Sequence, residues 1–404
     1  MSGNKFKIIN QCRACGNSNL KEFLKLEKLP IAGVYIEEKD FKKELCLPLS
    51  LLYCKSCGLV QTKETIAAEI YTEYSYSGTF SQHYRDHLNW VSEYLVSEKN
   101  IKQKSILEIG CSDGYLLQRL KNLGKNEVFG YEPSIKLADK CRKRGIPISE
   151  KYFVEEFLSE TSFKNEVIII RHVLEHIDEL NSFLRGVNKC IKQNGILVIE
   201  VPDLEEIFNK NLYSNIFHQH LNYFSLYSLS NFLEKYGFYL SYLKRVDIHG
   251  GSIFSIFEKE KYKKLNLHLS KITFSDCVEF TKSLHTYYDK IRQLVENCIN
   301  KGLKVYGYGA AERTFTILGM TRLTSKEIIK IYDKNLFLHN KYIPLSNILI
   351  DTTENIRNDD IGCLIIFATS FEDEILNELK EKYSFKGKII SIKNIPKICN
   401  VDGQ

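Results

Sequence analysis

Two pairs of cysteines near the start of the chain have the spacing of metal-binding knuckles. Cys12 and Cys15 are separated by two residues, as are Cys54 and Cys57, and a glycine follows each pair directly. A tight turn at that glycine can aim backbone amides at the sulfurs, and four thiolates suit a closed tetrahedral zinc site. Because such a site leaves no coordination position open, the sequence predicts structural rather than catalytic zinc.

A glycine-bearing turn follows the apolar run at residues 105–109. Gly110 and Gly114 let the backbone approach a ligand at the carboxyl end of a strand, where open α/β sheets bind theirs. Glu132 ends the next predicted strand and can accept hydrogen bonds from both hydroxyls of a ribose. The turn lacks the G-x-G-x-x-G pattern of nicotinamide dinucleotide sites. With Glu108 inside the strand, it resembles the first motif of class I methyltransferases, which bind S-adenosylmethionine (SAM). The expected cofactor contacts are Glu108, Gly110, Cys111, Asp113, Gly114, Glu132 and His172.

Histidines in two segments could act as acids or bases near neutral pH. His176 follows the fourth predicted strand of the central α/β layer, where it could face an active cleft, and a core or capping histidine is the alternative. His218 and His220 flank Gln219 and precede a run of aromatic residues that could exclude water. A general base is the favoured interpretation of this cluster. Structural hydrogen bonding and metal binding are its alternatives.

Tyrosines gather just before residue 77, in a loop that leaves the cysteine-rich module. Tyr71, Tyr74 and Tyr76 could donate hydrogen bonds to a developing enolate or to a hydroxylated substrate, and packing against neighbours is the alternative. Near the other end of the chain, the strand-like run containing Tyr308 is followed by glycine and alanine, and Asp333 ends a later strand. That arrangement is also found at nucleotide-binding sites.

The elements that position these residues indicate an α/β protein. The 404 residues exceed what one hydrophobic core usually serves. Helix and strand signals alternate from about residue 82 to 257, and a Lys-rich connection, a long helix and further strands follow. We expect an N-terminal zinc-binding module with the tyrosine-rich loop at 1–80, a central class I methyltransferase Rossmann-like domain at 81–257, and a C-terminal Rossmann-like α/β domain at 258–404.

Composition narrows the function classes. The 56 basic and 50 acidic residues are spread along the chain without a dense basic block, which argues against a nucleic-acid partner. The chain has 12 cysteines, but its first residues lack the apolar core of a secretory signal, and no apolar run approaches the ~20 residues that span a bilayer. We therefore expect reduced thiols, a cytoplasmic location, no membrane partner, and a monomer or weak oligomer.

Taken together, these motifs resemble the zinc-containing, SAM-dependent sugar C-methyltransferases, which act on nucleotide-linked keto-deoxysugars. The resemblance covers nearly the whole chain. It rests on the two knuckles, ILEIGCSDG at 106–114, HQH-x2-YFS at 218–225, HGGS at 249–252, GYGAA at 307–311 and DKN at 333–335. It implies that a histidine removes the proton on the carbon next to a ketone, and that the resulting enolate attacks the methyl group of SAM.

Carried over by motif position, the resemblance implies His220 as the base, with His176 and Tyr76 binding the keto oxygen. His218 and Gln219 complete the expected catalytic cluster. The C-terminal domain and the tyrosine loop are expected to bind the sugar nucleotide. The expected substrate contacts are Tyr74, Tyr76, Asn222, Tyr223, His249 and Tyr308.

The chain departs from the family pattern beside the expected base. Gln219 stands where an acidic residue is usual, and Phe217 stands where a tyrosine is usual. A neutral amide cannot raise the basicity of a neighbouring imidazole as a carboxylate can. The alternatives to carbon methylation are O- or N-methylation of a related sugar nucleotide and, from another class, a zinc-dependent nucleic-acid-binding protein.

Overall fold

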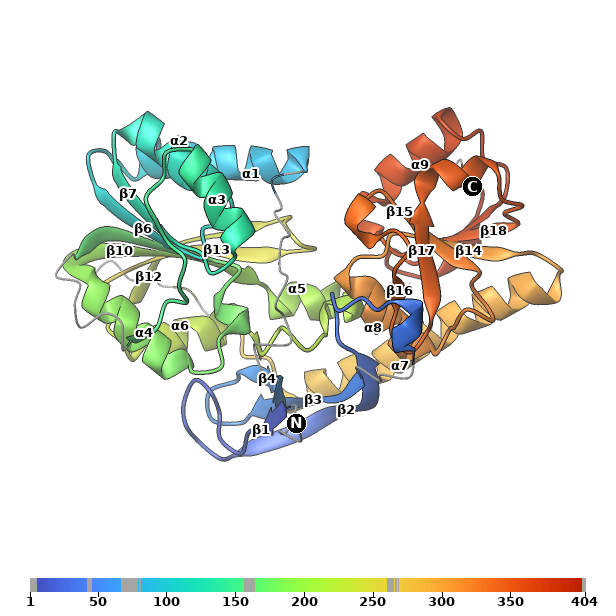
Figure 1. Ribbon diagram of the computed structural model, residues 1–404. Helices are drawn as coiled ribbons and strands as arrows, with labels where there is room; N and C mark the ends of the chain where they lie inside the picture. The colour runs from blue at the N-terminus through green and yellow to red at the C-terminus, as the bar shows by residue number, and fades with distance from the viewer. Residues whose placement is uncertain are drawn as a thin grey trace.

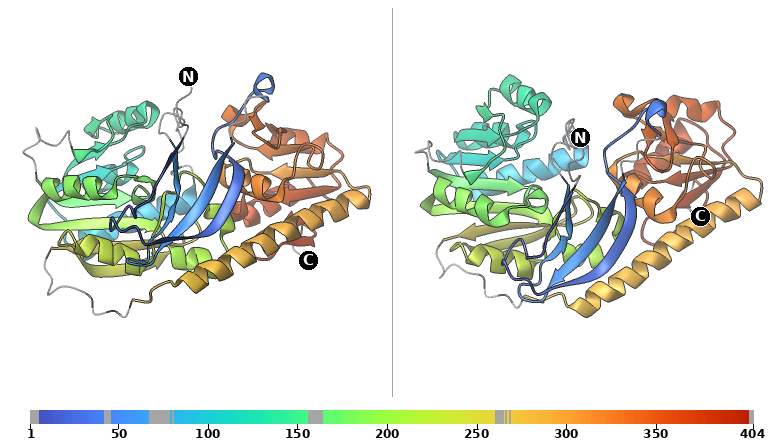
Figure 2. Two further views of the ribbon diagram at one scale, coloured as in Figure 1. Left: turned by 90° about the horizontal axis from the view of Figure 1, so that it is seen from below. Right: turned by 60° about the horizontal axis from the view of Figure 1, so that its bottom comes forward.

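The computed structural model describes residues 6–41, 46–66, 79, 81–155, 164–259, 265, 267 and 269–401. They form two α/β lobes, with an antiparallel sheet from the N-terminal segment lying below and between the lobes (Figure 1). The helix α7, Phe274–Asn300, runs along one side of that sheet toward the C-terminal lobe (Figure 2). No helix in these described ranges is both long enough and apolar enough to cross a membrane.

The N-terminal sheet takes one of its strands from the central part of the chain. Its described strands are ordered β11-β4-β3-β2, and all neighbours are antiparallel. Tyr223 of β11 pairs with Val60 of β4, so this sheet ends on a strand that directly follows the histidine cluster. The strands β1 and β5 form a separate antiparallel pair. The strands are β1 Phe6–Ile8, β2 Leu20–Pro30, β3 Cys46–Cys54, β4 Val60–Thr62, β5 Glu64–Ile66 and β11 Asn222–Tyr223.

The central lobe is built on a sheet of order β12-β13-β10-β9-β6-β7-β8, parallel from β10 to β8 and antiparallel at β13 and β12. Its inner strands read as continuous apolar runs because helices cover both faces, and Ile168, Ile169 and Ile170 are fully buried. The strands are β6 Ser105–Ile109, β7 Glu127–Tyr131, β8 Ile148–Ser149, β9 Asn165–Arg171, β10 Ile191–Pro202, β12 Tyr239–Val246 and β13 Ser252–Glu258. The helices are α1 Gln82–Glu93, α2 Tyr115–Gly124, α3 Ile135–Lys143, α4 Leu180–Cys190, α5 Leu204–Asn209 and α6 Leu226–Glu234.

The C-terminal lobe repeats the wound α/β arrangement with its own sheet of order β16-β17-β15-β14-β18-β19-β20. The outermost pairs are antiparallel, and the inner pairs are parallel. The strands are β14 Val305–Tyr308, β15 Lys330–Asp333, β16 Tyr342–Ile343, β17 Ile348–Thr352, β18 Cys363–Ile366, β19 Lys388–Ser391 and β20 Lys397–Cys399. The helices are α8 Glu312–Thr321 and α9 Glu372–Glu381.

One hydrophobic core joins the N-terminal sheet to the C-terminal lobe. Leu24 and Leu49 from the N-terminal sheet, Phe280 and Leu284 from α7, and Ile331 from β15 belong to the same buried cluster. Helix α7 starts at a capping box, in which the Thr273 side chain and the Asp276 carboxylate bond each other's backbone amides. The shared core fixes the N-terminal sheet against the C-terminal lobe, so loops from both can contribute to one site.

Candidate active site and zinc centre

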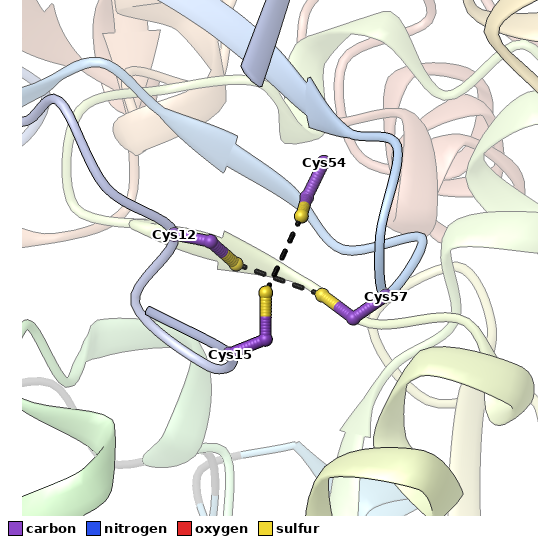
Figure 3. Close-up of side chains that lie close together, drawn as sticks. All are labelled: Cys12, Cys15, Cys54 and Cys57. Carbon is purple, nitrogen blue, oxygen red and sulfur yellow. Dashed lines mark hydrogen bonds between the residues drawn. The ribbon is translucent and has the colours of Figure 1, made fainter. Parts of the chain in front are cut away.

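The four knuckle cysteines converge on one point (Figure 3). Cys12 Sγ lies 3.6 Å from Cys57 Sγ, and Cys15 Sγ lies 3.5 Å from Cys54 Sγ. All four sulfurs are within 4.8 Å of one another, and none forms a disulfide. Tetrahedral zinc with Zn–S bonds of about 2.3 Å places its sulfurs ~3.8 Å apart. The donor set and its spacing therefore fit a structural zinc ion.

The glycine after each knuckle makes the turn that presents the sulfurs. Gly16 and Gly58 have φ values of +71° and +76°, a region that glycine adopts without strain. Gly16 N donates to Cys12 O and Gly58 N donates to Cys54 O, each at 2.8 Å. Two matching turns, one on each side of the cluster, give the zinc site its closed form.

The predicted cofactor turn lies at the carboxyl end of β6. Gly110 has φ +72°, and a Cβ there would meet Val173 Cγ2 at 2.4 Å, so this turn packs directly on the segment after β9. Glu132 is buried at the end of β7 and accepts hydrogen bonds from Ser112 N at 3.0 Å and Ser134 N at 2.9 Å. Each of its oxygens keeps a lone pair for a further donor, such as a ribose hydroxyl.

The side chains of Glu108, Cys111 and Asp113, in and before this turn, have different surroundings. Glu108 is buried, its Oε2 makes no hydrogen bond to the described residues, and burial raises the pKa of its carboxyl to about 8. Asp113 accepts from Thr79 Oγ1 at 2.6 Å and from Tyr115 N at 3.2 Å. The Cys111 side chain is buried beside Cys141, so only its backbone could reach a cofactor. An orphaned buried carboxyl oxygen beside a glycine turn fits a cofactor that carries an amino group.

A buried charged network lies behind this turn, and sequence reasoning missed it. Glu200 of β10 is fully buried and binds Arg171 Nε at 2.7 Å and His87 Nε2 at 2.9 Å. Arg171 also donates to Tyr84 OH at 3.2 Å and lies 3.9 Å from Glu108 Oε1. Proximity to Arg171 and to His172 holds the pKa of Glu200 well below its usual value, although burial opposes this. The only sequence signal was a charged residue in each of two otherwise apolar strands.

His172 lies between two carboxylates and stays protonated near neutral pH. Its Nε2 is 3.3 Å from Glu200 Oε1, and its Nδ1 is 3.4 Å from Glu175 Oε1. Burial acts to lower the pKa of His172, but the hydrogen bonds to these carboxylates outweigh burial and raise the pKa to about 9. The His249 ring packs edge-on against it, with centroids 4.6 Å apart. His172 is thus a positive charge beside Glu200 and Glu175, and this charge acts on His220.

His176 and His220 form a pair whose ring centroids are 5.1 Å apart. His176 is exposed, and its Nδ1 is 2.8 Å from the Gln219 carbonyl oxygen, so Nδ1 carries the proton and Nε2 can accept one. His220 is partly buried, and its ring lies tilted against that of Phe217 with centroids 4.0 Å apart. Its Nδ1 makes no hydrogen bond to the described residues. Desolvation, followed by the charge of His176, lowers the pKa of His220 well below its usual value. His220 is therefore neutral and able to accept a proton.

Loops from all three parts of the chain meet at this pair. Gln219 Nε2 donates to Ala32 O of the N-terminal segment at 3.1 Å, and Tyr35 OH donates to Ala310 O of the C-terminal lobe at 2.7 Å. Arg313 at the start of α8 donates to the carbonyl of His249 at 2.8 Å. The junction of the three parts is where a substrate could contact all of them.

Two residues of the predicted catalytic cluster, His218 and Gln219, point toward the N-terminal segment instead of the pair of His176 and His220. The His218 ring is buried, with Nε2 3.2 Å from the carbonyls of Leu47 and Pro48 in β3, and this position does not fit the catalytic role expected for it. Burial lowers the pKa of His218 to about 4. Gln219 contacts the N-terminal loop rather than His220.

Three predicted substrate contacts are likewise committed to packing. Asn222 Nδ2 donates to the carbonyls of Leu174 and Ile177, and Tyr223 OH lies buried against the backbone of Phe217. Tyr308 is buried, and its hydroxyl donates to Glu378 of α9 at 2.9 Å. Direct substrate contact does not fit these three positions. Tyr74 and Tyr76 lie outside the described residues.

Three protein-family models together match most of the chain. A methyltransferase domain matches residues 81–243, a zinc binding domain matches residues 12–71, and a C-methyltransferase C-terminal domain matches residues 247–396. The C-methyltransferase NovU of Streptomyces niveus is 24% identical, and the match covers 98% of each chain.

Other relatives match a smaller share of the chain. The ubiquinone biosynthesis O-methyltransferase of Pelagibacter ubique is 30% identical over 30% of this chain and 49% of its own length. This chain thus spans about half of that relative. Among solved structures, PH0226 protein from Pyrococcus horikoshii has a TM-score of 0.38 at 15% identity and covers 48% of this chain and 100% of its own. Magnesium protoporphyrin IX methyltransferase from Synechocystis, solved with bound S-adenosylhomocysteine (SAH), has a TM-score of 0.36 at 14% identity. The match covers 48% of this chain and 92% of that chain. The ordered match of three domains and the whole-length relative show a SAM-dependent methyltransferase that is similar to the C-methyltransferases along nearly its whole length.

Proposed function

We propose that this enzyme methylates a carbon atom of a nucleotide-linked 4-keto-deoxysugar and that His220 is the base. The observation that carries the proposal is His220 itself, a neutral imidazole whose buried Nδ1 makes no hydrogen bond to the described residues. It lies where loops of all three parts of the chain meet. The chain's full-length similarity to a C-methyltransferase supports carbon as the target.

The proposed cofactor site is the turn after β6 together with the end of β7. Glu132 would bind the ribose hydroxyls, and Glu108 would bind the amino group of the methionine part. Gly110, Asp113 and Gly114 would supply the backbone that lies against the cofactor. When bound, SAM supplies a methyl group that its positive sulfur has already made electrophilic. The chain's own residues then have to create the carbon nucleophile.

In the proposed mechanism His220 removes a proton from the carbon next to the ketone. The C–H electron pair becomes the carbon–carbon double bond of an enolate, and the carbonyl electrons move to oxygen. His176 would donate a hydrogen bond to that oxygen from Nε2, which requires both ring nitrogens to carry protons because Nδ1–H already bonds the Gln219 carbonyl. Tyr76, outside the described residues, would add a second donor. Donors aimed at a developing oxyanion act most strongly where water is excluded. The enolate carbon would then form its bond to the methyl group while the S–C electron pair stays on sulfur, which gives S-adenosylhomocysteine as the leaving group. The proton on His220 would leave to solvent.

The zinc module supports this site through Arg13, which lies inside the first knuckle. The Arg13 side chain is buried, and its Nη1 donates to Thr62 O at 2.6 Å and to Leu221 O at 3.4 Å. Its Nε pairs with Asp178 at 2.8 Å. Leu221 follows His220 directly, and Asp178 lies two residues after His176. Zinc would thus hold both histidine segments in place without taking part in the chemistry.

The test uses dTDP-4-keto-6-deoxyglucose in D2O with S-adenosylhomocysteine, which fills the cofactor site but carries no methyl group to transfer. Proton NMR should show loss of a signal next to the ketone with the native enzyme and no loss with His220→Asn. With 13C-methyl SAM in place of S-adenosylhomocysteine, the product's methyl carbon should resonate in the C-methyl range. A resonance at the lower field typical of O- or N-methyl groups would favour the alternative reaction.

A further inference from the structure

We propose that Glu175 is the carboxylate that stabilises His220 when His220 takes up the substrate proton. Position 219, next to His220, is occupied by a neutral glutamine, so Glu175 would take the role of an acidic residue at that position. This inference rests on the proposed function. One Glu175 oxygen and one ring nitrogen each of His176 and His220 lie within 4.8 Å of one another. Glu175 is 2% exposed, and its Oε2 makes no hydrogen bond to the described residues. Glu175 is therefore a positioning residue, because it acts on the substrate only through His220.

The backbone fixes Glu175 against the histidine segment. Leu221 N donates to the Glu175 carbonyl at 2.7 Å, and Asn222 Nδ2 donates to the neighbouring carbonyl of Leu174 at 3.2 Å. His176 Nδ1 bonds the Gln219 carbonyl from the other side. These three contacts tie the turn after β9 to the segment that carries the base, so the carboxylate and the imidazole keep their separation.

The Glu175 side chain is also oriented before any substrate binds. Its Oε1 lies 3.4 Å from Nδ1 of His172, which leaves Oε2 for another group. His220 Nδ1 is likewise buried without a hydrogen bond to the described residues. Two unpartnered buried polar atoms in neighbouring side chains are uncommon, and such groups often mark a functional site.

Proton removal needs a counter-charge at this position. Taking a proton turns neutral His220 into an imidazolium, and its surroundings are otherwise unfavourable to positive charge because desolvation and nearby cations lower its pKa. Gln219 carries no charge, and its side-chain amide donates to Ala32 O. Glu175 has an oxygen within 4.8 Å of a His220 ring nitrogen, so it can stabilise the imidazolium as it forms, the role a carboxylate takes beside a general-base histidine. The charged and titratable groups facing the pair are His172, Glu175, His176, His249, Glu312 and Arg313.

The experiment measures deuterium exchange into dTDP-4-keto-6-deoxyglucose as a function of pH, with S-adenosylhomocysteine present. Glu175→Gln should lower the plateau rate roughly 100-fold. It should also move the acid limb of the profile to lower pH, because removing the carboxylate lowers the pKa of His220. A merely structural defect would lower the plateau without moving the limb. Glu175→Asp should restore part of the rate. Glu179→Gln, an exposed carboxylate in the same segment, serves as the matched control.

The outcomes separate this inference from the proposed function. If the native enzyme exchanges the proton and Glu175→Gln keeps both its rate and its acid limb, the role of Glu175 is refuted and His220 remains the base. If the native enzyme binds S-adenosylhomocysteine but exchanges no proton, the proposed function fails and the role of Glu175 fails with it. Metal analysis of the purified protein should find one zinc per chain. A second metal lost in Glu175→Gln would mean that Glu175, His176 and His220 bind a cation instead.

Discussion

Replacing Glu200 by glutamine should destabilise the central domain by about 3 kcal/mol. The Glu200 carboxylate is fully buried, accepts a hydrogen bond from Arg171 at 2.7 Å, and binds His87 and His172 at 2.9 and 3.3 Å. Removing one partner of a buried pair costs roughly 3–5 kcal/mol because the other charge stays buried. We expect the lower end because the Glu108 carboxyl, 3.9 Å from Arg171, can ionise in response.

Trp90 provides the assay, because it is the single tryptophan of the chain and lies beside this network. Its ring centroid is 5.7 Å from that of His87 and 5.2 Å from that of Phe254. Its fluorescence therefore follows unfolding of the central domain in urea. With a slope of about 2 kcal/mol per molar urea, a loss of about 3 kcal/mol moves the midpoint down by about 1.5 M.

Two further variants test the reasoning behind this magnitude. Glu93→Gln removes a carboxylate that is exposed and pairs with Arg119 on the surface, so the midpoint should change by less than about 0.5 M. The double variant Arg171→Met with Glu200→Met should have its midpoint at a higher urea concentration than Glu200→Gln, because it leaves no buried guanidinium without a partner. A Glu200→Gln midpoint within about 0.5 M of the native protein would refute the argument.

Three further predictions use the same protein. Stability followed by Trp90 should fall as pH rises from about 6.5 to about 9, because the pKa of His172 is raised to about 9 and the stabilising protonated form is lost across that window. His172→Gln should reduce this fall without abolishing it, because the Glu108 carboxyl, with a pKa of about 8, acts in the same direction. Cys57→Ser should lower the zinc content and speed amide hydrogen exchange across residues 46–66, and unchanged exchange would contradict the zinc assignment. Glu132→Ala should weaken S-adenosylhomocysteine binding by about 1–3 kcal/mol in calorimetry, while Glu127→Ala, exposed on the same strand, should bind normally.

The zinc cysteines and the cofactor motif could be predicted from sequence because each signal is local. A knuckle spans four residues and ends at a glycine, and the turn after β6 follows its own strand directly. The structure brings the four cysteines together, and the α/β fold is confirmed by the observed sheets and the matching families. The roles proposed for Glu132 and His220 stay predictions.

The buried network could not be predicted because its members come from distant segments. Glu200, Arg171 and His87 stand on β10, β9 and α1, and only strand order places them together. The choice between His218 and His220 depends on an irregular segment, where no periodicity tells which side chain lies beside His176. Glu175 directly precedes His176 in the sequence, but only the fold places it near His220.

Contacts with the N-terminal module hold the segment that carries His220, and the sequence alone did not indicate these contacts. Arg13 bonds the carbonyl after His220, His218 reaches the carbonyls of β3, and Gln219 reaches Ala32. The strand β11, which follows this segment, pairs with β4 of the N-terminal sheet. These four contacts hold the residues before and after His220, so His220 should shift when the N-terminal module loosens. Replacing a zinc ligand should therefore slow the proposed proton removal. The proposed role of His220 therefore makes the zinc module part of the proposed active site.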